Sequence, residues 1–188
     1  AQSYYAVKTY EDGDKVNITA AAEGMKAVSS ATVVPSRFPL TSINFVLKGG
    51  EPNQLQFWIH FTDNAQTKDY YALKVERKRQ FWNDSKYSVE NSSLTLNLDD
   101  EPLLNTSSGL DDILMIENEF YRNLYYWDDT KIQGKSYKVR LNTNYEADYE
   151  DDFITPDGVE HIKCQVKYRI SLYSLSEEFY RYLKSLND

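Results

Sequence analysis

The sequence predicts a mostly β protein, an antiparallel β-sandwich of immunoglobulin-like character with a single helix at its C-terminal end. Aromatic residues form 14% of the 188 residues, and such side chains favour a pleated, half-buried surface. Short segments of alternating polarity recur along the chain and are separated by turn residues. The C-terminal end alone changes clearly to a helical spacing, while residues 113–126 stay open between an irregular segment and a short helix.

Five segments in the first half of the chain have the alternation or the β-branched composition of strands. They are residues 4–10, 15–20, 27–34, 42–47 and 55–61. Turn-forming residues such as Gly13 and Gly24 separate them. We therefore expect consecutive short antiparallel strands in this half.

The clearest hairpin pairs residues 55–61 with residues 70–76. Alternation in the first arm places Trp58 and His60 on one face. The other face carries four apolar side chains that we expect to be buried: Leu55, Phe57, Ile59 and Phe61. This hairpin fixes the predicted inner face of the sandwich.

The second half of the chain is less regular. An Asn-, Asp- and Ser-rich stretch predicts an inserted excursion at residues 83–130, with one strand at 93–98. Strands are expected at 135–141 and 162–173, with an acidic loop between them. The chain should therefore form one domain over residues 1–188, or part of a larger protein.

The last segment, residues 174–187, has the pattern of an amphipathic helix. Ser174 and Glu177 fit a capping box. Apolar side chains then recur at spacings of three and four: Leu175, Phe179, Tyr182, Leu183 and Leu186. We expect the helix to run from about Leu175 to Leu186, with Phe179 and Leu183 against the sheet.

Composition argues against several function classes. The net charge of −8, from 29 acidic and 21 basic residues, repels a phosphate backbone, so no nucleic-acid partner is expected. The apolar runs are far shorter than the roughly 18–20 residues of a membrane helix. Cys164 is the single cysteine, which excludes an intrachain disulfide, and its alternating neighbours place it in a strand.

The templates for catalysis and for zinc are incomplete. The chain has only two histidines, His60 and His161, and lacks G-x-S-x-G, H-E-x-x-H and a Gly-rich phosphate loop. His161 with Cys164 is only a pair, too few ligands for zinc. We therefore predict no enzyme, no cofactor and no metal, although a pair of distant carboxylates of the glycosidase type stays open.

Two clusters remain as candidate sites. One is acidic and could ligate Ca²⁺ through oxygen, but its spacing matches no EF-hand and a solvated loop that protects an edge strand is favoured: Asp148, Glu150, Asp151 and Asp152. The other is aromatic and is the candidate ligand-binding surface: Tyr121, Tyr125, Tyr126 and Trp127. Exposed rings could stack on sugars or anchor a protein, whereas ordinary core is the favoured alternative. We expect any binding to use residues 83–130 and not the acidic loop.

Several blocks of sequence resemble one known family. They are ATVVP and PLTSI at residues 31–35 and 39–43, FTD and DYYALKV at 61–63 and 69–75, ISLYSLSEEFYRYLKS at 170–185, and a weaker WDDTKIQGK at 127–135. In this order they are similar to a Bacteroidota family of predicted outer-membrane lipoproteins, catalogued as a domain of unknown function. The resemblance implies no known enzymatic activity and no known functional residues.

The resemblance also implies a location and a setting. Members of the family are exported, usually have a lipid-anchoring cysteine and a further β domain, and are often encoded beside TonB-dependent receptors of the starch-utilisation type. We therefore expect a non-catalytic accessory domain at the outer membrane or cell surface, which binds such a receptor or an envelope glycan in nutrient uptake. The alternatives are an adhesin-like structural module of the envelope and a glycan-active enzyme domain.

Three observations would separate these alternatives. A cleft with two facing carboxylates would favour the enzyme, and an exposed aromatic platform would favour the glycan binder. A flat apolar patch would favour a protein partner.

Overall fold

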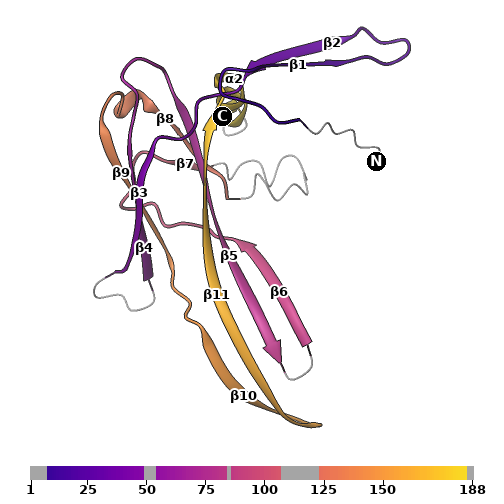
Figure 1. Cartoon of the computed structure of the whole chain (residues 1–188), viewed down its shortest axis with the longest axis vertical. Coiled ribbons are helices and arrows are strands. Elements are labelled where there is room, and N and C mark those ends of the chain that lie inside the picture. Colours follow the sequence, from indigo (N-terminus) through magenta and orange to yellow (C-terminus); the bar gives the residue numbers. More distant parts are fainter. Residues whose placement is uncertain (1–7, 49–53, 84–85, 107–122, 186–188) are drawn as a thin grey trace.

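The computed structural model describes residues 8–48, 54–83, 86–106 and 123–185 (Figure 1). Its strands pair antiparallel, and the one α-helix of the described residues, α2 (Glu177–Ser185), lies at the C-terminal end. The predicted class, a mostly β antiparallel fold consistent with a β-sandwich and closed by a C-terminal helix, is confirmed. The described part of the chain holds no helix whose length and apolar content would let it span a bilayer.

One layer of the sandwich, the three-stranded sheet, has the order β3-β4-β9. Its members are β3 (Leu40–Leu47), β4 (Gln54–Thr62) and β9 (Ser136–Asn144). The four apolar side chains of β4 predicted to face inward are all at most 5% exposed, and Trp58 and His60 on the other face are only partly buried. The predicted register of this strand is therefore confirmed.

The other layer, the long sheet, has the order β10-β11-β5-β8-β7, and β6 also pairs with β5. Its members are β5 (Tyr70–Asn83), β6 (Lys86–Ser93), β7 (Asn105–Thr106), β8 (Tyr125–Asp128), β10 (Tyr149–Thr155) and β11 (Gly158–Leu175). Cys164 is buried in β11, as the alternation predicts. Figure 1 shows β5, β6, β10 and β11 continuing well beyond the end of the three-stranded sheet.

The main core lies between the two sheets. Phe61 of β4 contacts Tyr71 of β5 at a ring-centroid distance of 5.6 Å, and Phe57 contacts Tyr168 at 5.9 Å. Ile59 and Leu73 are fully buried between the layers. Apolar burial on this scale is the main stabilising contribution to such a sandwich.

The predicted hairpin of residues 55–61 with 70–76 is wrong. Each of these strands presents an apolar face, but β4 pairs with β3 and β9 while β5 pairs with β6, β8 and β11. The connection from β4 to β5 is an arch that carries the chain from one layer to the other. Two amphipathic strands bury their apolar faces equally well by pairing side by side or by facing each other, so alternation could not distinguish the two.

The C-terminal helix covers the outer face of the long sheet. Leu183 is fully buried beside Ala72 and Tyr126, whereas Phe179 is only partly buried. The helix begins two to three residues later than predicted, because β11 continues to Leu175. Its cap is Ser176, whose Oγ accepts the Phe179 N–H at 3.3 Å, and not Ser174.

Other boundaries also differ from those predicted. Residues 86–93 form β6, a hairpin partner of β5, so the excursion predicted from residue 83 begins later, and the strand expected at 93–98 is reduced to a bridge between Asn97 and Asn142. The acidic loop contains the strand β10. Residues 4–7 of the first predicted strand lie outside the described residues, and its residues 8–10 are not a strand.

The predicted strands at 15–20 and 27–34 are present as β1 (Lys15–Ala20) and β2 (Val28–Val33). They pair only with each other and form a two-stranded ribbon beside α2 (Figure 1). A hydrogen bond of 3.2 Å from the Thr32 hydroxyl to Glu178 joins the ribbon to the helix. The ribbon therefore extends the molecule and adds no layer to the sandwich.

Candidate functional site

The predicted aromatic surface is part of the core. Tyr125 and Tyr126 are 3% exposed and Trp127 is 1% exposed, because β8 lies inside the long sheet. Trp127 packs on Tyr71 at 5.5 Å. Stacking on a ligand requires an exposed ring face, so the stacking interpretation of these three residues is wrong and the core interpretation is confirmed. Tyr121 lies outside the described residues.

The predicted acidic loop offers no convergent metal site in the residues described. Glu150, Asp151 and Asp152 lie in β10, where successive side chains point to opposite faces. Asp148 instead accepts the backbone N–H of Val166 at 2.7 Å. β10 is an edge strand, and exposed carboxylates along it oppose pairing with another chain, which agrees with the protective role favoured from sequence.

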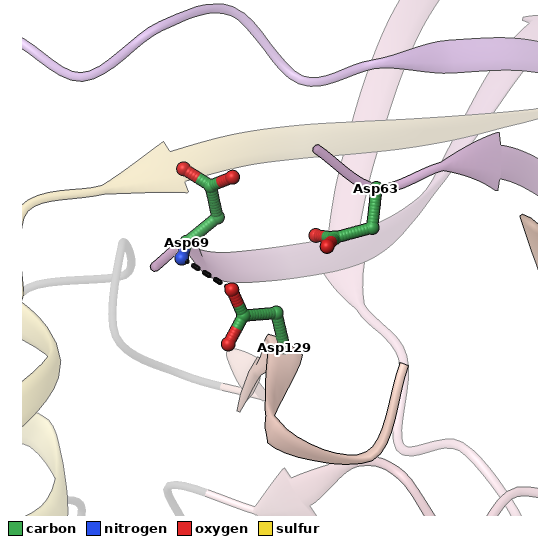
Figure 2. A group of neighbouring side chains, drawn as sticks. All are labelled: Asp63, Asp69 and Asp129. Carbon is green, nitrogen blue, oxygen red and sulfur yellow. Dashed lines mark hydrogen bonds between the residues drawn. The ribbon is translucent and has the colours of Figure 1, made fainter. Parts of the chain in front are cut away.

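A different set of carboxylates does converge, at the arches between the two sheets. Asp63 follows β4, Asp69 precedes β5, and Asp129 begins η1 (Asp129–Lys131), the 3-10 turn after β8. One oxygen of each lies within 4.8 Å of the others (Figure 2). Asp63 and Asp129 are 4% and 0% exposed.

Protein donors already occupy the two buried carboxylates. Asp63 accepts the Tyr71 hydroxyl at 2.7 Å and the Gly134 N–H at 2.9 Å. Asp129 accepts the Asp69 N–H at 2.7 Å, the bond drawn in Figure 2, and the Lys68 ammonium. Because every oxygen of both groups has a donor, we interpret the cluster as a staple that locks the arches together.

Gly134 is specifically required in this staple. Its φ of +69° is unfavourable for other residues, and a Cβ there would lie 2.7 Å from the Cβ of Ala65. The close approach lets its N–H reach Asp63. The arch after β4 and the turn before β9 therefore interlock through backbone as well as side chains.

Electrostatics of the neighbouring groups agree with a structural role. Burial, and then the hydrogen bond to Asp63, raise the pKa of the Tyr71 hydroxyl far above its usual value. Burial lowers the pKa of Lys68, but the hydrogen bond to Asp129 and the charges of Asp128 and Asp129 outweigh it and raise the pKa overall. Both groups thus keep their protons at neutral pH and act as fixed donors.

One edge of the three-stranded sheet is sealed by the loop of residues 94–104. Asn97 donates its N–H to the carbonyl of Asn142 on β9 at 2.9 Å. Glu101, 2% exposed, accepts the Arg140 N–H at 2.9 Å and the Tyr137 hydroxyl at 2.8 Å. Backbone groups that a free edge would expose are therefore satisfied within the chain.

The opposite edge, β3, pairs with no further strand among the described residues. Lys48 directs its N–H to Gln54 of β4, and residues of an antiparallel strand alternate in direction. The N–H and C=O groups of three residues therefore point to the free side, and their side chains, which face inward, are 40%, 70% and 55% exposed: Ile43, Phe45 and Leu47.

A hollow of about 570 Å³ opens beneath this strand. Phe45, Phe57, Tyr145 and Tyr168 bring aromatic rings to its wall. A free edge, a row of exposed inward-facing apolar side chains and an adjoining hollow lie together, so we take this open edge as the candidate functional site.

A family model for the domain of unknown function DUF4249 matches residues 1–188. The chain belongs to this family. No curated protein and no solved structure matches the chain with significance.

The structure gives the family-like blocks a physical meaning. The blocks at 61–63, 69–75 and 127–135 meet in the carboxylate staple, which contains Asp63, Asp69, Asp129 and Gly134. The blocks were visible in the sequence, but their meeting depends on the two arches. The open edge gave no sequence signal, because Ile43, Phe45 and Leu47 alternate like a covered strand.

Proposed function

We propose that this domain is a non-catalytic binding module of an outer-membrane accessory lipoprotein, and that β3 holds an extended segment of a partner protein. The membrane location, the lipid anchor, the Bacteroidota origin and a TonB-dependent receptor as the partner rest on the family resemblance. The site and the binding mode rest on the open edge of the three-stranded sheet.

The single observation that carries the proposal is Phe45. This aromatic side chain faces the inner side of the sandwich directly opposite Phe57, and yet it is 70% exposed. Leaving such a ring in water forgoes about 1.5–3 kcal/mol of burial. A partner protein that covered this ring would recover that free energy. The exposed ring therefore favours a partner-binding domain over a purely structural module.

The binding mode follows from the backbone. An added strand would accept and donate hydrogen bonds at Ile43, Phe45 and Leu47, and alternate side chains of that strand would enter the hollow. Such addition gives affinity through the main chain and specificity through the hollow. The preferred ligand is therefore an extended segment with apolar residues at every second position.

The glycan-active enzyme is the weaker alternative. Asp63 and Asp129 face each other, but they are buried and each oxygen already accepts a hydrogen bond. A general acid or nucleophile must reach the substrate directly. Asp63 and Asp129 therefore favour a structural role in the staple over a catalytic one.

Substitutions at position 45 test the proposal in the full-length lipoprotein. Phe45→Pro removes an N–H that points away from β4, so the sheet should persist while strand addition is blocked. Phe45→Ala removes only the ring. A photoreactive phenylalanine at position 45 should crosslink a partner from native outer membranes, and both variants should lose copurification of that same protein.

The matched control is Ile18 on the ribbon, an apolar side chain of comparable exposure at 67%. A crosslinker at position 18 should give no such product, and Ile18→Ala should keep the partner. Equal products from both positions, or a partner retained by Phe45→Pro and Phe45→Ala alike, would contradict the proposal. Circular dichroism of each variant checks that the fold persists.

A further inference from the structure

The outer face of the long sheet carries a basic surface in which two like charges lie at directly opposed positions. Lys78 of β5 lies directly opposite Lys167 of β11, and Arg169 is the next residue of β11 on the same face. Like charges at directly opposed positions, roughly 5 Å apart, destabilise a sheet. A local conflict of this kind is expected where a ligand relieves it.

No carboxylate of the described residues forms an ion pair with these three cations. Glu76 lies directly opposite Arg169 in the sheet, but its carboxylate forms its ion pair with Lys74 at 3.8 Å. The chain as a whole has a net charge of −8, so an unpaired group of three cations is not a consequence of composition.

The cations line a hollow of about 750 Å³. Lys167 and Arg169 are exposed and Lys78 is partly exposed. Asn91 of β6, directly opposite Lys78, and Glu76 also line the hollow. Three cations and an amide in an open depression can neutralise and orient an oxyanion such as sulfate, phosphate or carboxylate.

An aromatic pair lies farther along the same face. Trp82 is four residues from Lys78 along β5, about 13 Å at strand spacing, and its ring lies 5.3 Å from that of Tyr87 on β6. Gln80 lies between Lys78 and Trp82 along β5, and its side-chain amide donates to the Tyr87 hydroxyl at 2.6 Å. Aromatic rings beside hydrogen-bonding side chains are typical of surfaces that bind sugar rings.

We infer that this outer face binds an anionic oligosaccharide. Its sulfate, phosphate or carboxylate group would lie between Lys78, Lys167 and Arg169, and a neighbouring sugar ring would contact Trp82 and Tyr87. The site lies on the face of the long sheet opposite the core, away from β3, and does not depend on the proposed partner binding.

Calorimetric titration with a chondroitin sulfate tetrasaccharide tests the inference, with its desulfated form and inorganic sulfate as further probes. The double variant Lys78→Gln/Lys167→Gln should bind the sulfated tetrasaccharide at least ten-fold more weakly. Lys26→Gln/Lys184→Gln, which changes the net charge equally at exposed positions, should stay within two-fold of the wild type. Added salt should weaken binding, because the attraction is screened.

The other arms identify the ligand chemistry. Trp82→Ala should weaken binding of the sulfated tetrasaccharide several-fold and leave binding of inorganic sulfate unchanged. The desulfated tetrasaccharide should bind the wild type more weakly than the sulfated one. Without ligand, Lys167→Gln should raise the melting temperature by relieving repulsion. No binding by the wild type, or equal loss in both double variants, would overturn the inference. None of these readouts involves Phe45, so the two proposals fail separately.

Discussion

The two edges of the three-stranded sheet are treated in opposite ways. At β9, the loop of residues 94–104 lies along the strand, buries Leu96 and Leu103, and supplies Glu101 to the Arg140 N–H. At β3, the described chain supplies no covering segment, and inward-facing Phe45 is left exposed. An uncovered apolar edge favours association with another chain, so the contrast with the covered β9 edge supports the proposal that β3 is a binding surface.

The largest expected difference in stability is between two phenylalanines that lie opposite each other on neighbouring strands, Phe57 of β4 and Phe45 of β3. Phe57→Ala should lower the free energy of unfolding by about 3–5 kcal/mol, because that ring is 5% exposed. Phe45→Ala, directly opposite, should cost under about 1 kcal/mol. Urea denaturation of both variants measures the contrast. Similar losses would mean that the edge is covered in solution.

A matched leucine pair tests the edges themselves. Leu96→Ala removes a side chain that is 6% exposed in the sealing loop and should cost about 2–4 kcal/mol. Leu47→Ala, 55% exposed on β3, should cost under about 1 kcal/mol. The same denaturation measurements apply. If Leu47→Ala proved the more harmful, the assignment of sealed and open edges would be reversed.

Removing Glu101 should unseal the β9 edge. Glu101→Ala leaves the Arg140 N–H and the Tyr137 hydroxyl without their acceptor and should cost about 2–3 kcal/mol. Glu150→Ala, an exposed carboxylate on β10, is the control and should cost under about 0.5 kcal/mol.

The same substitution has a spectroscopic signature. Burial, and then the hydrogen bond to Glu101, raise the pKa of Tyr137 to about 12. Absorbance titration of Glu101→Ala should show a lower Tyr137 pKa that stays above 10, because burial remains. An unchanged titration would show that Glu101 does not contact this hydroxyl.

Asp128 should make the stability of the fold depend on pH, whereas the apolar β3 edge should not. Burial raises the pKa of Asp128, but hydrogen bonds from Thr130 and Tyr180 and the Lys68 charge outweigh it and lower the pKa to about 2. The ionised form therefore stabilises the fold above about pH 4, and this contribution is lost as pH falls through about 2.

Asp128→Asn should lower the free energy of unfolding by about 1–2 kcal/mol at pH 7, after allowance for partial exposure of the side chain. The deficit relative to the wild type should shrink between pH 4 and pH 2. Denaturation curves at several pH values measure it. A deficit that does not change with pH would attribute the effect to packing.

Strands were predictable where alternation reflected burial on one face. Leu55 to Phe61 and residues 162–173 were found in this way, since period-two patterns follow directly from pleating. Pairing partners were not predictable from that pattern, as the arch between β4 and β5 shows. The seven residues from Asp63 to Asp69 suit an inter-sheet connection as well as a hairpin loop.

Composition misled in two places because pairing overrode propensity. Asp and Glu are depleted in strands, yet residues 150–152 form part of β10 because β11 pairs with them. Tyr125 and Trp127 occur in an acidic, turn-rich setting but belong to a central strand. The open edge was not predictable, because the pattern of β3 specifies an apolar face and not whether another segment covers it.

The long pairing of β5 with β11 has a consequence for how the chain acquires its structure. All 14 residues of β5 have partners in β11, from Asn83 with Ile162 to Tyr70 with Leu175. The centre of the sandwich therefore cannot form until residues 162–175 are available, however early the first strands are synthesised. Such distant pairing raises the contact order, and slow folding late in biogenesis is the expected result.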